Sequence, residues 1–219
     1  DTSIKGKWTS VLGLFPTSKT GGGTKIQISE VVRKSVEENG NFIVLDLSPK
    51  RGEVESENLQ ARFVQLIETA IVESGANYYA QGKKANCLIV MDEAHRFIAD
   101  NSPDERIKEL TSHIISSVRT TRKYGIGYMF ITQTVESLDD EILRQMRVYG
   151  FGYGLTSGPE LRKVAEIINS PAALQLYKSF IDPSSNGKFP FMFFGPISPL
   201  SFTGSPLFIE VYKDFSDFK

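Results

Sequence analysis

Residues 88–97 read LIVMDEAHRF, and this stretch decides the fold. Its first four residues, Leu88-Ile89-Val90-Met91, are all apolar and show no polar alternation, which predicts a strand buried on both faces of a parallel sheet. The run ends abruptly in two acids, Asp92 and Glu93. Because ligands of open α/β sheets bind beyond the carboxyl ends of the strands, we expect both carboxylates to face the ligand crevice.

Helical and strand patterns alternate on both sides of this strand. The spacing of apolar residues and the flanking stop signals predict helices over residues 29–39, 57–80, 103–124, 137–146, 159–168 and 171–180. Shorter apolar runs predict strands over residues 42–47, 128–132 and 148–155. Ser102 is the expected N-cap of the third helix, with Glu105 completing a capping box, and Ser137 is the expected cap of the fourth.

This alternation predicts one α/β domain over residues 1–219, with a mostly parallel sheet flanked by helices. The domain divides into a flexible lead-in, a core and a C-terminal extension, which are residues 1–28, 29–180 and 181–219. The extension contains two strand-like pieces, 189–194 and 207–212, on either side of a Pro-, Gly- and Ser-rich link. These pieces suit an added hairpin or a lid better than the main sheet.

Composition narrows the class of protein. A hydrophobic content of 40% with 23% charged residues describes a soluble globular chain. The 25 Lys and Arg against 26 Asp and Glu give a net charge of −1, so contact with DNA must come from a local patch. The single cysteine, Cys87, excludes an internal disulfide, fits a reducing, cytoplasmic setting and begins an apolar run as a core residue would. No apolar stretch approaches the ~20 residues that cross a bilayer, so no membrane partner is expected.

The acid pair has the form of a Walker B motif. In such a motif the first carboxylate, Asp92, holds the Mg²⁺ shell, usually through water, and the second, Glu93, polarises or deprotonates the water that attacks the γ-phosphate of ATP. Alternatively, both acids merely cap the strand or the next helix. The strand over residues 128–132 ends in Gln133, whose neutral amide either orients water and senses the γ-phosphate or is simply an exposed polar group.

Arg119 and Arg122 lie three residues apart on the helix predicted over residues 103–124, next to its core face. A guanidinium that projects from such a helix into a neighbouring subunit's phosphate site acts as an arginine finger. It contributes about 10³ to 10⁵ in rate where it operates. The alternative is that these arginines and Lys123 form a solvated basic face.

Four segments, in order, resemble the HerA-FtsK group of ring-forming DNA translocases, and most closely the bacterial and archaeal HerA helicases. They are residues 41–48 (NFIVLDLS), 88–97 (LIVMDEAHRF), 116–133 (SSVRTTRKYGIGYMFITQ) and 138–147 (LDDEILRQMR). The similarity covers most of residues 25–180. It implies a RecA-like P-loop NTPase core that uses ATP and Mg²⁺, a hexamer that threads duplex DNA, and often a NurA-type nuclease as a partner in DNA end resection.

By this resemblance Asp92 and Glu93 are the Walker B pair, Gln133 is the sensor, and Arg119 or Arg122 is the finger acting in trans. The phosphate-binding loop of the family, G-x-x-x-x-G-K-[ST], does not occur in the sequence. The nearest stretch is residues 18–25 (SKTGGGTK), but its lysine follows the threonine instead of preceding it, and the next helix starts late.

We therefore interpret the chain as the C-terminal part of a longer HerA-type ATPase whose Walker A strand lies upstream of Asp1. On this interpretation the chain alone does not hydrolyse ATP. The P-loop strand normally lies beside the strand that ends at Gln133, so we expect an open edge or gap there.

Two other interpretations compete with this one. Residues 92–95 spell DEAH, but a superfamily-2 helicase would need S-A-T after the following strand and a Q-x-x-G-R-x-x-R motif in a second lobe, and the sequence has ITQT at residues 131–134. Alternatively, the chain is a non-catalytic ring-assembly module that lends an arginine to a partner; the reading frame upstream of Asp1 would distinguish the two. We expect His95 to be a structural neighbour of the acids and His113 to be a surface or interface residue, and neither has a zinc-ligand set.

Overall fold

The computed structural model of the chain describes residues 28–38, 40–47, 57–99, 102–197 and 204–212. The chain divides into two compact units, residues 1–132 and 133–219. The first holds a parallel pair of strands and the second an antiparallel sheet. Among the described residues, none of the helices combines the length and the apolar character that crossing a bilayer requires.

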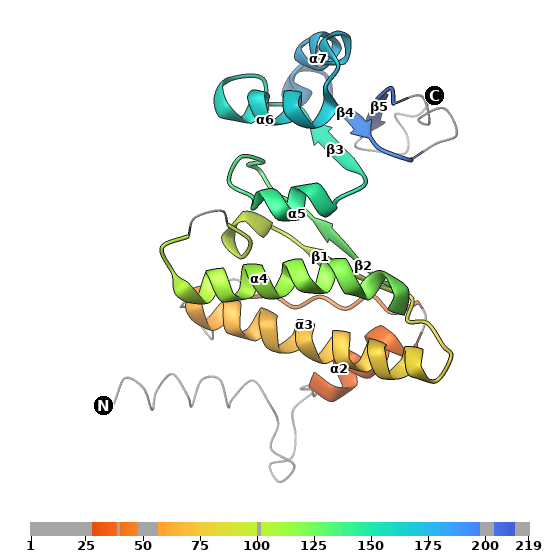
Figure 1. Cartoon of the computed structure of the whole chain (residues 1–219). Coiled ribbons are helices and arrows are strands. Elements are labelled where there is room, and N and C mark those ends of the chain that lie inside the picture. The colour runs from red at the N-terminus through yellow and green to blue at the C-terminus, as the bar shows by residue number, and fades with distance from the viewer. Residues whose placement is uncertain (1–27, 39, 48–56, 100–101, 198–203, 213–219) are drawn as a thin grey trace. The chain divides into compact units, whose positions relative to one another are not determined.

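The described part of the first unit contains α2 (Ile28–Val36), α3 (Glu57–Ala80), β1 (Cys87–Met91), the 3-10 turn η2 (Ala94–Arg96), α4 (Glu105–Thr120), the 3-10 turn η3 (Thr121–Tyr124) and β2 (Ile126–Phe130). The strands β1 and β2 are parallel, with Met91 opposite Phe130, so both strands end at the same level. The helices α3 and α4 lie side by side (Figure 1). The helix predicted over residues 57–80 is confirmed at both ends.

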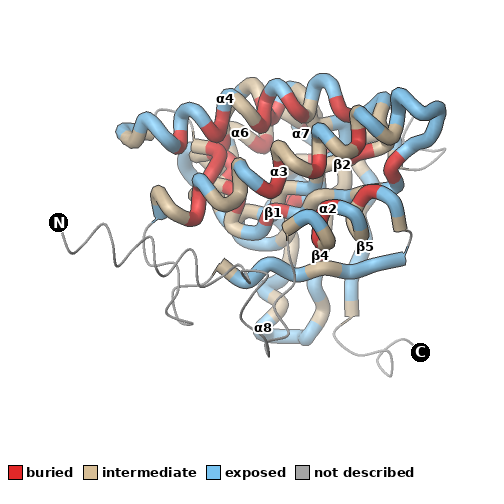
Figure 2. Tube along the Cα trace, turned by 90° about the horizontal axis from the view of Figure 1, so that it is seen from below, coloured by how far each residue is buried: buried red, intermediate tan, exposed pale blue. Residues whose placement is uncertain are grey.

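The core of the first unit lies between the helices and one face of this sheet. Buried residues recur along α3 and α4, as the red segments of Figure 2 show. One cluster joins α2 and α3 to the sheet and consists of Val32, Val36, Ile67, Ile71, Ala85 and Ile126. Cys87 packs against this cluster, and burial raises the pKa of its thiol. The buried side chains of α2 and α3 pack against Cys87 and Ile89 in this way, which anchors β1 and, with it, the acids that follow.

Among the described residues of the first unit, none buries the other face of the sheet, which corrects the prediction that β1 is buried on both faces. Leu88 and Val90 are 59% and 49% exposed, and Met129 of β2 is 49% exposed. Successive side chains of a strand point to opposite faces, and the described helices bury only one of them. An uninterrupted apolar run therefore indicates that both faces of the strand are apolar, but it does not show that other elements pack against both faces.

The strand predicted over residues 42–47 is not formed, and this segment belongs to no regular element. Phe42 is 92% exposed, so its ring is not packed as it would be in a sheet. A buried side chain holds the end of the segment, because Gln60 Nε2 donates to the Leu47 carbonyl at 2.8 Å. Gln60 Oε1 also accepts from Arg96 Nη2 at 2.9 Å, which links the segment to the turn after β1.

The described part of the second unit contains α5 (Asp140–Gln145), β3 (Tyr149–Gly152), α6 (Gly158–Ile168), α7 (Pro171–Lys178), α8 (Pro183–Asn186), β4 (Lys188–Phe194) and β5 (Leu207–Tyr212). Its strands form an antiparallel sheet in the order β3-β4-β5. The predicted hairpin of β4 and β5 is confirmed, but β3 joins it instead of a parallel neighbour. Among the described residues, the expected parallel pairing is found only between β1 and β2.

Two helix starts differ from the expectation. The N-cap of α4 is Asp104 rather than Ser102, and its carboxylate accepts from the Arg106 amide at 2.8 Å. Ser102 Oγ instead accepts from the Asp104 amide at 3.2 Å. The N-cap of α5 is Asp139 rather than Ser137. Serine and aspartate are nearly equal as caps, so the sequence pattern does not choose between two of them that lie close together.

A buried polar cluster lies inside the first unit. Glu68 of α3 is 3% exposed; its Oε1 accepts from the Tyr128 hydroxyl, and its Oε2 contacts His113 Nε2. His113 Nε2 also lies 3.1 Å from Thr69 Oγ1. The His113 side chain is 28% exposed, so it lies partly at the surface as expected, but its ring also contacts this buried carboxylate. Burial, together with the Glu68 carboxylate, raises the pKa of the Tyr128 hydroxyl well above its usual range.

Gly125 joins η3 to β2 at a φ of +82°, and a Cβ at this position would lie 1.9 Å from the Ala85 carbonyl oxygen. We expect Gly125→Ala to lower the free energy of unfolding by more than about 2 kcal/mol, because left-handed strain adds to a backbone clash. Gly82→Ala is the matched control, since its φ is +77° but nothing lies within 4 Å of the added Cβ. Urea unfolding of both variants measures the difference, and equal losses would contradict the prediction.

The raised pKa of Tyr128 predicts a stability that depends on pH. An unfolded-state tyrosine ionises near pH ~10 whereas the folded hydroxyl keeps its proton, so this contribution is complete below pH ~10 and is lost as pH rises further. Relative to Tyr128→Phe, the wild-type chain should lose up to about 1.4 kcal/mol of stability per pH unit in that range. Urea unfolding of both chains across this range tests it, and a difference that stays constant with pH would refute it.

Candidate functional site

Asp92 and Glu93 follow directly on β1 and lie at the carboxyl edge of the parallel pair. Asp92 is exposed and Glu93 is half-buried. Two backbone hydrogen bonds extend the ladder beyond the strands: the Ile131 amide donates to the Met91 carbonyl, and the Ala94 amide donates to the Ile131 carbonyl, both at 2.9 Å. The acids thus lie at the edge where an open α/β sheet forms its ligand crevice.

The turn after β1 depends on the backbone conformation of Glu93. Its φ of 50° and ψ of 44° are left-handed, which costs a residue other than glycine about 1–2 kcal/mol. In this conformation the fully buried Ala94 bonds to the Ile131 carbonyl, and the Glu93 amide donates to Asp92 Oδ1 at 3.0 Å. Backbone strain of this kind persists where the surrounding structure enforces it, and it is concentrated at functional sites.

The two carboxylates differ in how far they act as caps. Asp92 Oδ1 accepts the adjacent backbone amide, so the capping alternative describes part of what Asp92 does. Glu93 occupies the N-cap position of η2, yet its side chain forms no capping bond there. Its Oε2 lies 3.4 Å from His95 Nδ1 instead. The capping alternative therefore does not account for the Glu93 carboxylate.

His95 connects this turn to the neighbouring strand. Its Nδ1 lies 3.1 Å from Thr132 Oγ1, just beyond the end of β2. The two residues are 37 positions apart in the sequence, so neither helical nor strand periodicity predicts that they are in contact. The one signal in the sequence is that Thr132 directly precedes Gln133, the predicted sensor.

Gln133 is exposed and is the first residue of the second unit. The parallel register brings Thr132, its neighbour in the chain, to the same edge of the sheet as the acids. The approach of the Gln133 amide to Asp92 or Glu93 stays a prediction.

Arg119 and Arg122 lie at the opposite end of the sheet from the acids. Arg119 is in the last turn of α4, Arg122 is in η3, which leads through Gly125 into β2, and both arginines are exposed. Strands of five residues, at about 3.3 Å per residue, put roughly 16 Å between this end and the acids. The arginines and the acids of one chain are therefore not brought together.

The residues at the strand end fit a magnesium ion held mainly by phosphate oxygens and water. Mg²⁺ typically keeps several waters and takes one or two protein carboxylates beside the phosphates of a substrate. Asp92 offers one such exposed carboxylate. No group of three or more His, Cys, Asp or Glu side chains that could hold a metal ion occurs within the described ranges. The donor set therefore suits a nucleotide-dependent Mg²⁺ rather than an all-protein metal cage.

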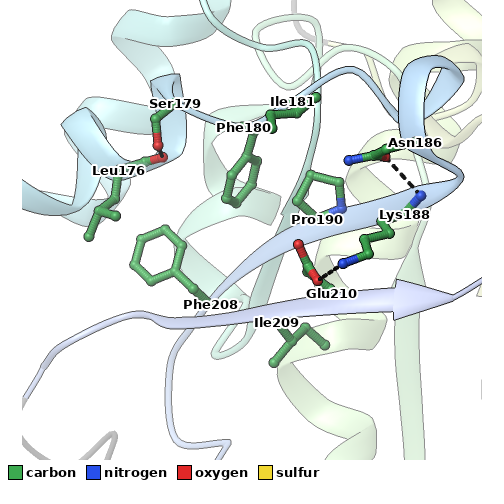
Figure 3. Close-up of a pocket in the computed structure, with 10 residues that line it drawn as sticks. All are labelled: Leu176, Ser179, Phe180, Ile181, Asn186, Lys188, Pro190, Phe208, Ile209 and Glu210. Carbon is green, nitrogen blue, oxygen red and sulfur yellow. Dashed lines mark hydrogen bonds and ion pairs between the residues drawn. The ribbon is translucent and has the colours of Figure 1, made fainter. Parts of the chain in front are cut away.

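The second unit has a pocket of about 280 Å³, lined by residues of α7, β4, β5 and the segments beside them (Figure 3). The two charged side chains of its wall form an ion pair, with Lys188 Nζ 3.3 Å from Glu210 Oε2. The backbone amide of Lys188 also donates to Asn186 Oδ1 at 3.0 Å. None of the predicted site residues lines this pocket. Because a paired lysine and glutamate give no net positive charge to attract phosphate, we do not place the nucleotide site here.

Comparison with protein-family models and with curated protein sequences finds no match to the chain. Among solved structures, the chain is similar to the genome packaging NTPase B204 from Sulfolobus turreted icosahedral virus 2 in complex with ATP-gammaS, at 17% identity and a TM-score of 0.44 over 68% of this chain and 62% of that chain. It is also similar to B204, the DNA-packaging ATPase from Sulfolobus turreted icosahedral virus, at 17% identity and a TM-score of 0.49 over 76% and 71% of the two chains.

A third similar structure is the N-terminal domain of zonular occludens toxin from Neisseria meningitidis, at 15% identity and a TM-score of 0.34 over 66% of this chain and 61% of that chain. The chain thus spans 62% of the length of the B204 structure solved with ATP-gammaS. Because these identities and TM-scores are low, the functional proposal below is based on the residues of the candidate site and not on these similarities.

Proposed function

We propose that the chain is the Walker B part of a RecA-like P-loop ATPase of the HerA type, in which ATP hydrolysis drives the translocation of DNA. The observation that carries the proposal is the setting of Glu93. Its carboxylate is half-buried at the carboxyl end of a parallel strand, on a left-handed turn that is bonded to the neighbouring strand. A water-activating base needs this fixed position beside a nucleotide.

The other residues of the edge take roles that follow from their chemistry. Asp92 carries an exposed carboxylate and would hold Mg²⁺ through water, and the bound ion would neutralise charge on the phosphates. Glu93 would accept a proton from the attacking water. Gln133 would sense the γ-phosphate as the first residue after Thr132.

The open edge of β2 supports the proposal that the phosphate-binding strand is a further strand, beyond those described, that pairs with β2. Among the described residues, β2 pairs with β1 on one side and with no strand on the other. The unpaired edge of a strand presents free backbone N–H and C=O groups, and these groups can pair with an added strand. A strand carrying the Walker A loop would pair here, and without it the chain alone would not turn over ATP.

The position of the arginines supports a ring. Because Arg119 and Arg122 lie a strand length away from their own acids, a finger from either one would act on the nucleotide of an adjacent subunit. A hexameric ring places every subunit next to such a neighbour, and duplex DNA would pass through its pore. A NurA-type nuclease is the partner that the resemblance to HerA helicases implies, in DNA repair.

We expect Glu93→Gln to lower kcat for ATP hydrolysis by about 10² to 10⁴ in the intact protein while the KM for ATP changes little. The amide keeps the shape of the side chain but cannot accept a proton. Glu109→Gln, the same change at an exposed position of α4, is the control and should keep wild-type kinetics. Unchanged hydrolysis in Glu93→Gln would remove the assigned base, and an intact protein without any ATPase activity would favour the ring-assembly module.

Mixing experiments identify the finger. Of Arg119→Ala and Arg122→Ala, the variant that removes the finger should lower kcat by about 10³ or more, and the other should change it by a few-fold. This variant and Glu93→Gln should each be strongly impaired alone, but a mixture of the two should recover partial activity, because a ring that contains both has interfaces where an intact Glu93 meets an intact arginine. Two inactive proteins that stay inactive when mixed would exclude action in trans.

A further inference from the structure

His95 is held between the acid pair and the end of the neighbouring strand. Its Nδ1 lies 3.4 Å from Glu93 Oε2 and 3.1 Å from Thr132 Oγ1. The side chains of His95 and Glu93 are 30% and 37% exposed, so both are partly shielded from water. The backbone beneath them is fixed, because the fully buried Ala94 between them is bonded to the Ile131 carbonyl. The imidazole therefore faces both groups from a rigid base.

The chemistry of the three groups favours a proton on Nδ1 of His95. A carboxylate only accepts hydrogen bonds, so the contact with Glu93 Oε2 is favourable when Nδ1 carries the proton, whereas the Thr132 hydroxyl can accept from or donate to Nδ1. The same Nδ1–H also faces Thr132 Oγ1. A single N–H forms a weaker hydrogen bond to each of two acceptors than it would form to one acceptor alone. Glu93 and Thr132 therefore compete for a single donor, and a displacement of Thr132 changes how firmly Glu93 is held.

We propose that His95 is a positioning residue that orients the Glu93 carboxylate and couples it to Thr132, and through Thr132 to Gln133. This inference rests on the proposed function, because it assigns a regulation to the same site. When Gln133 responds to the γ-phosphate, Thr132 moves with it as the adjacent residue. The shared Nδ1–H then redistributes between Thr132 and Glu93, and the base is oriented only when the sensor is engaged.

The first test reads the ring of His95 in the chain itself, without nucleotide turnover. The chain has two histidines, so ¹⁵N-detected spectra contain two imidazoles, and His95→Ala identifies the signals of His95. We expect the Nδ1–H tautomer, with ring signals that shift in Glu93→Gln and in Thr132→Val. Thr120→Val, which removes a hydroxyl bonded to the Ser116 carbonyl within α4, should leave them unchanged. An Nε2–H tautomer, or signals that ignore both substitutions, would overturn the proposal.

The second test uses ATP hydrolysis by the intact protein. His95→Ala should lower kcat by about 10- to 100-fold with a KM for ATP within about threefold of wild type, because a displaced base affects the chemical step more than binding. His95→Asn, whose side-chain amide offers a donor near the place of Nδ1, should recover part of the loss. Thr132→Val removes the competing acceptor and leaves the donor to Glu93, so its kcat should be no lower than that of wild type, and Thr132→Ser, which keeps the hydroxyl, should behave as wild type.

The outcomes separate the two proposals. If Glu93→Gln leaves hydrolysis unchanged, the proposed function fails whatever His95 does. If Glu93→Gln abolishes hydrolysis while His95→Ala keeps the wild-type kcat, the function stands and the positioning role is wrong. If His95→Ala and His95→Asn are equally impaired, the donor at Nδ1 is not what matters, and the coupling to Thr132 is wrong as well.

Discussion

The hydrogen bond from the Ala94 amide to the Ile131 carbonyl determines the geometry of the candidate site. Ala94 is fully buried, and a buried amide without a partner is strongly unfavourable. The chain meets this requirement one residue after the acid pair, and Glu93 takes a left-handed conformation in doing so. The strain at Glu93 is thus offset by a satisfied amide and a packed methyl group. The same bond fixes the position of His95 relative to the neighbouring strand.

The first unit has the pairing of a parallel sheet but only half of its covering. Parallel sheets occur almost exclusively with both faces packed, yet Leu88, Val90 and Met129 present a half-exposed apolar face, and β2 has an unpaired edge among the described residues. Full burial of one such side chain contributes about 1.5–3 kcal/mol, so covering this face would add substantially to stability. The exposed face has no helix packed against it and the open edge has no paired strand among the described residues. Both features agree with the proposal that further elements complete the sheet.

The sequence predicts those features that depend on local periodicity. The helix over residues 57–80 and the strand ending at Met91 are found where expected, because each has a long or strongly apolar pattern of its own. The prediction fails where a distant partner decides the outcome. Residues 42–47 have the composition of a strand but pair with none among the described strands, and β3 takes an antiparallel partner from the C-terminal extension. For the site, the acids were visible as a motif, whereas the contact between His95 and Thr132 exists only once β1 and β2 are paired.

The placement of the charged residues divides the proposed reaction between subunits. The acids and the His95 contact lie at the carboxyl end of the strands, and Arg119 and Arg122 lie at the amino end. A water-activating base must be held to within a fraction of an ångström, which covalent neighbours and backbone bonds can provide inside one chain. A finger has a different task, because it can report that the adjacent subunit is in place. An assembly built in the proposed way would orient its base locally but complete its charge stabilisation only at an interface, so hydrolysis would depend on the ring without any change in the turn that carries Glu93.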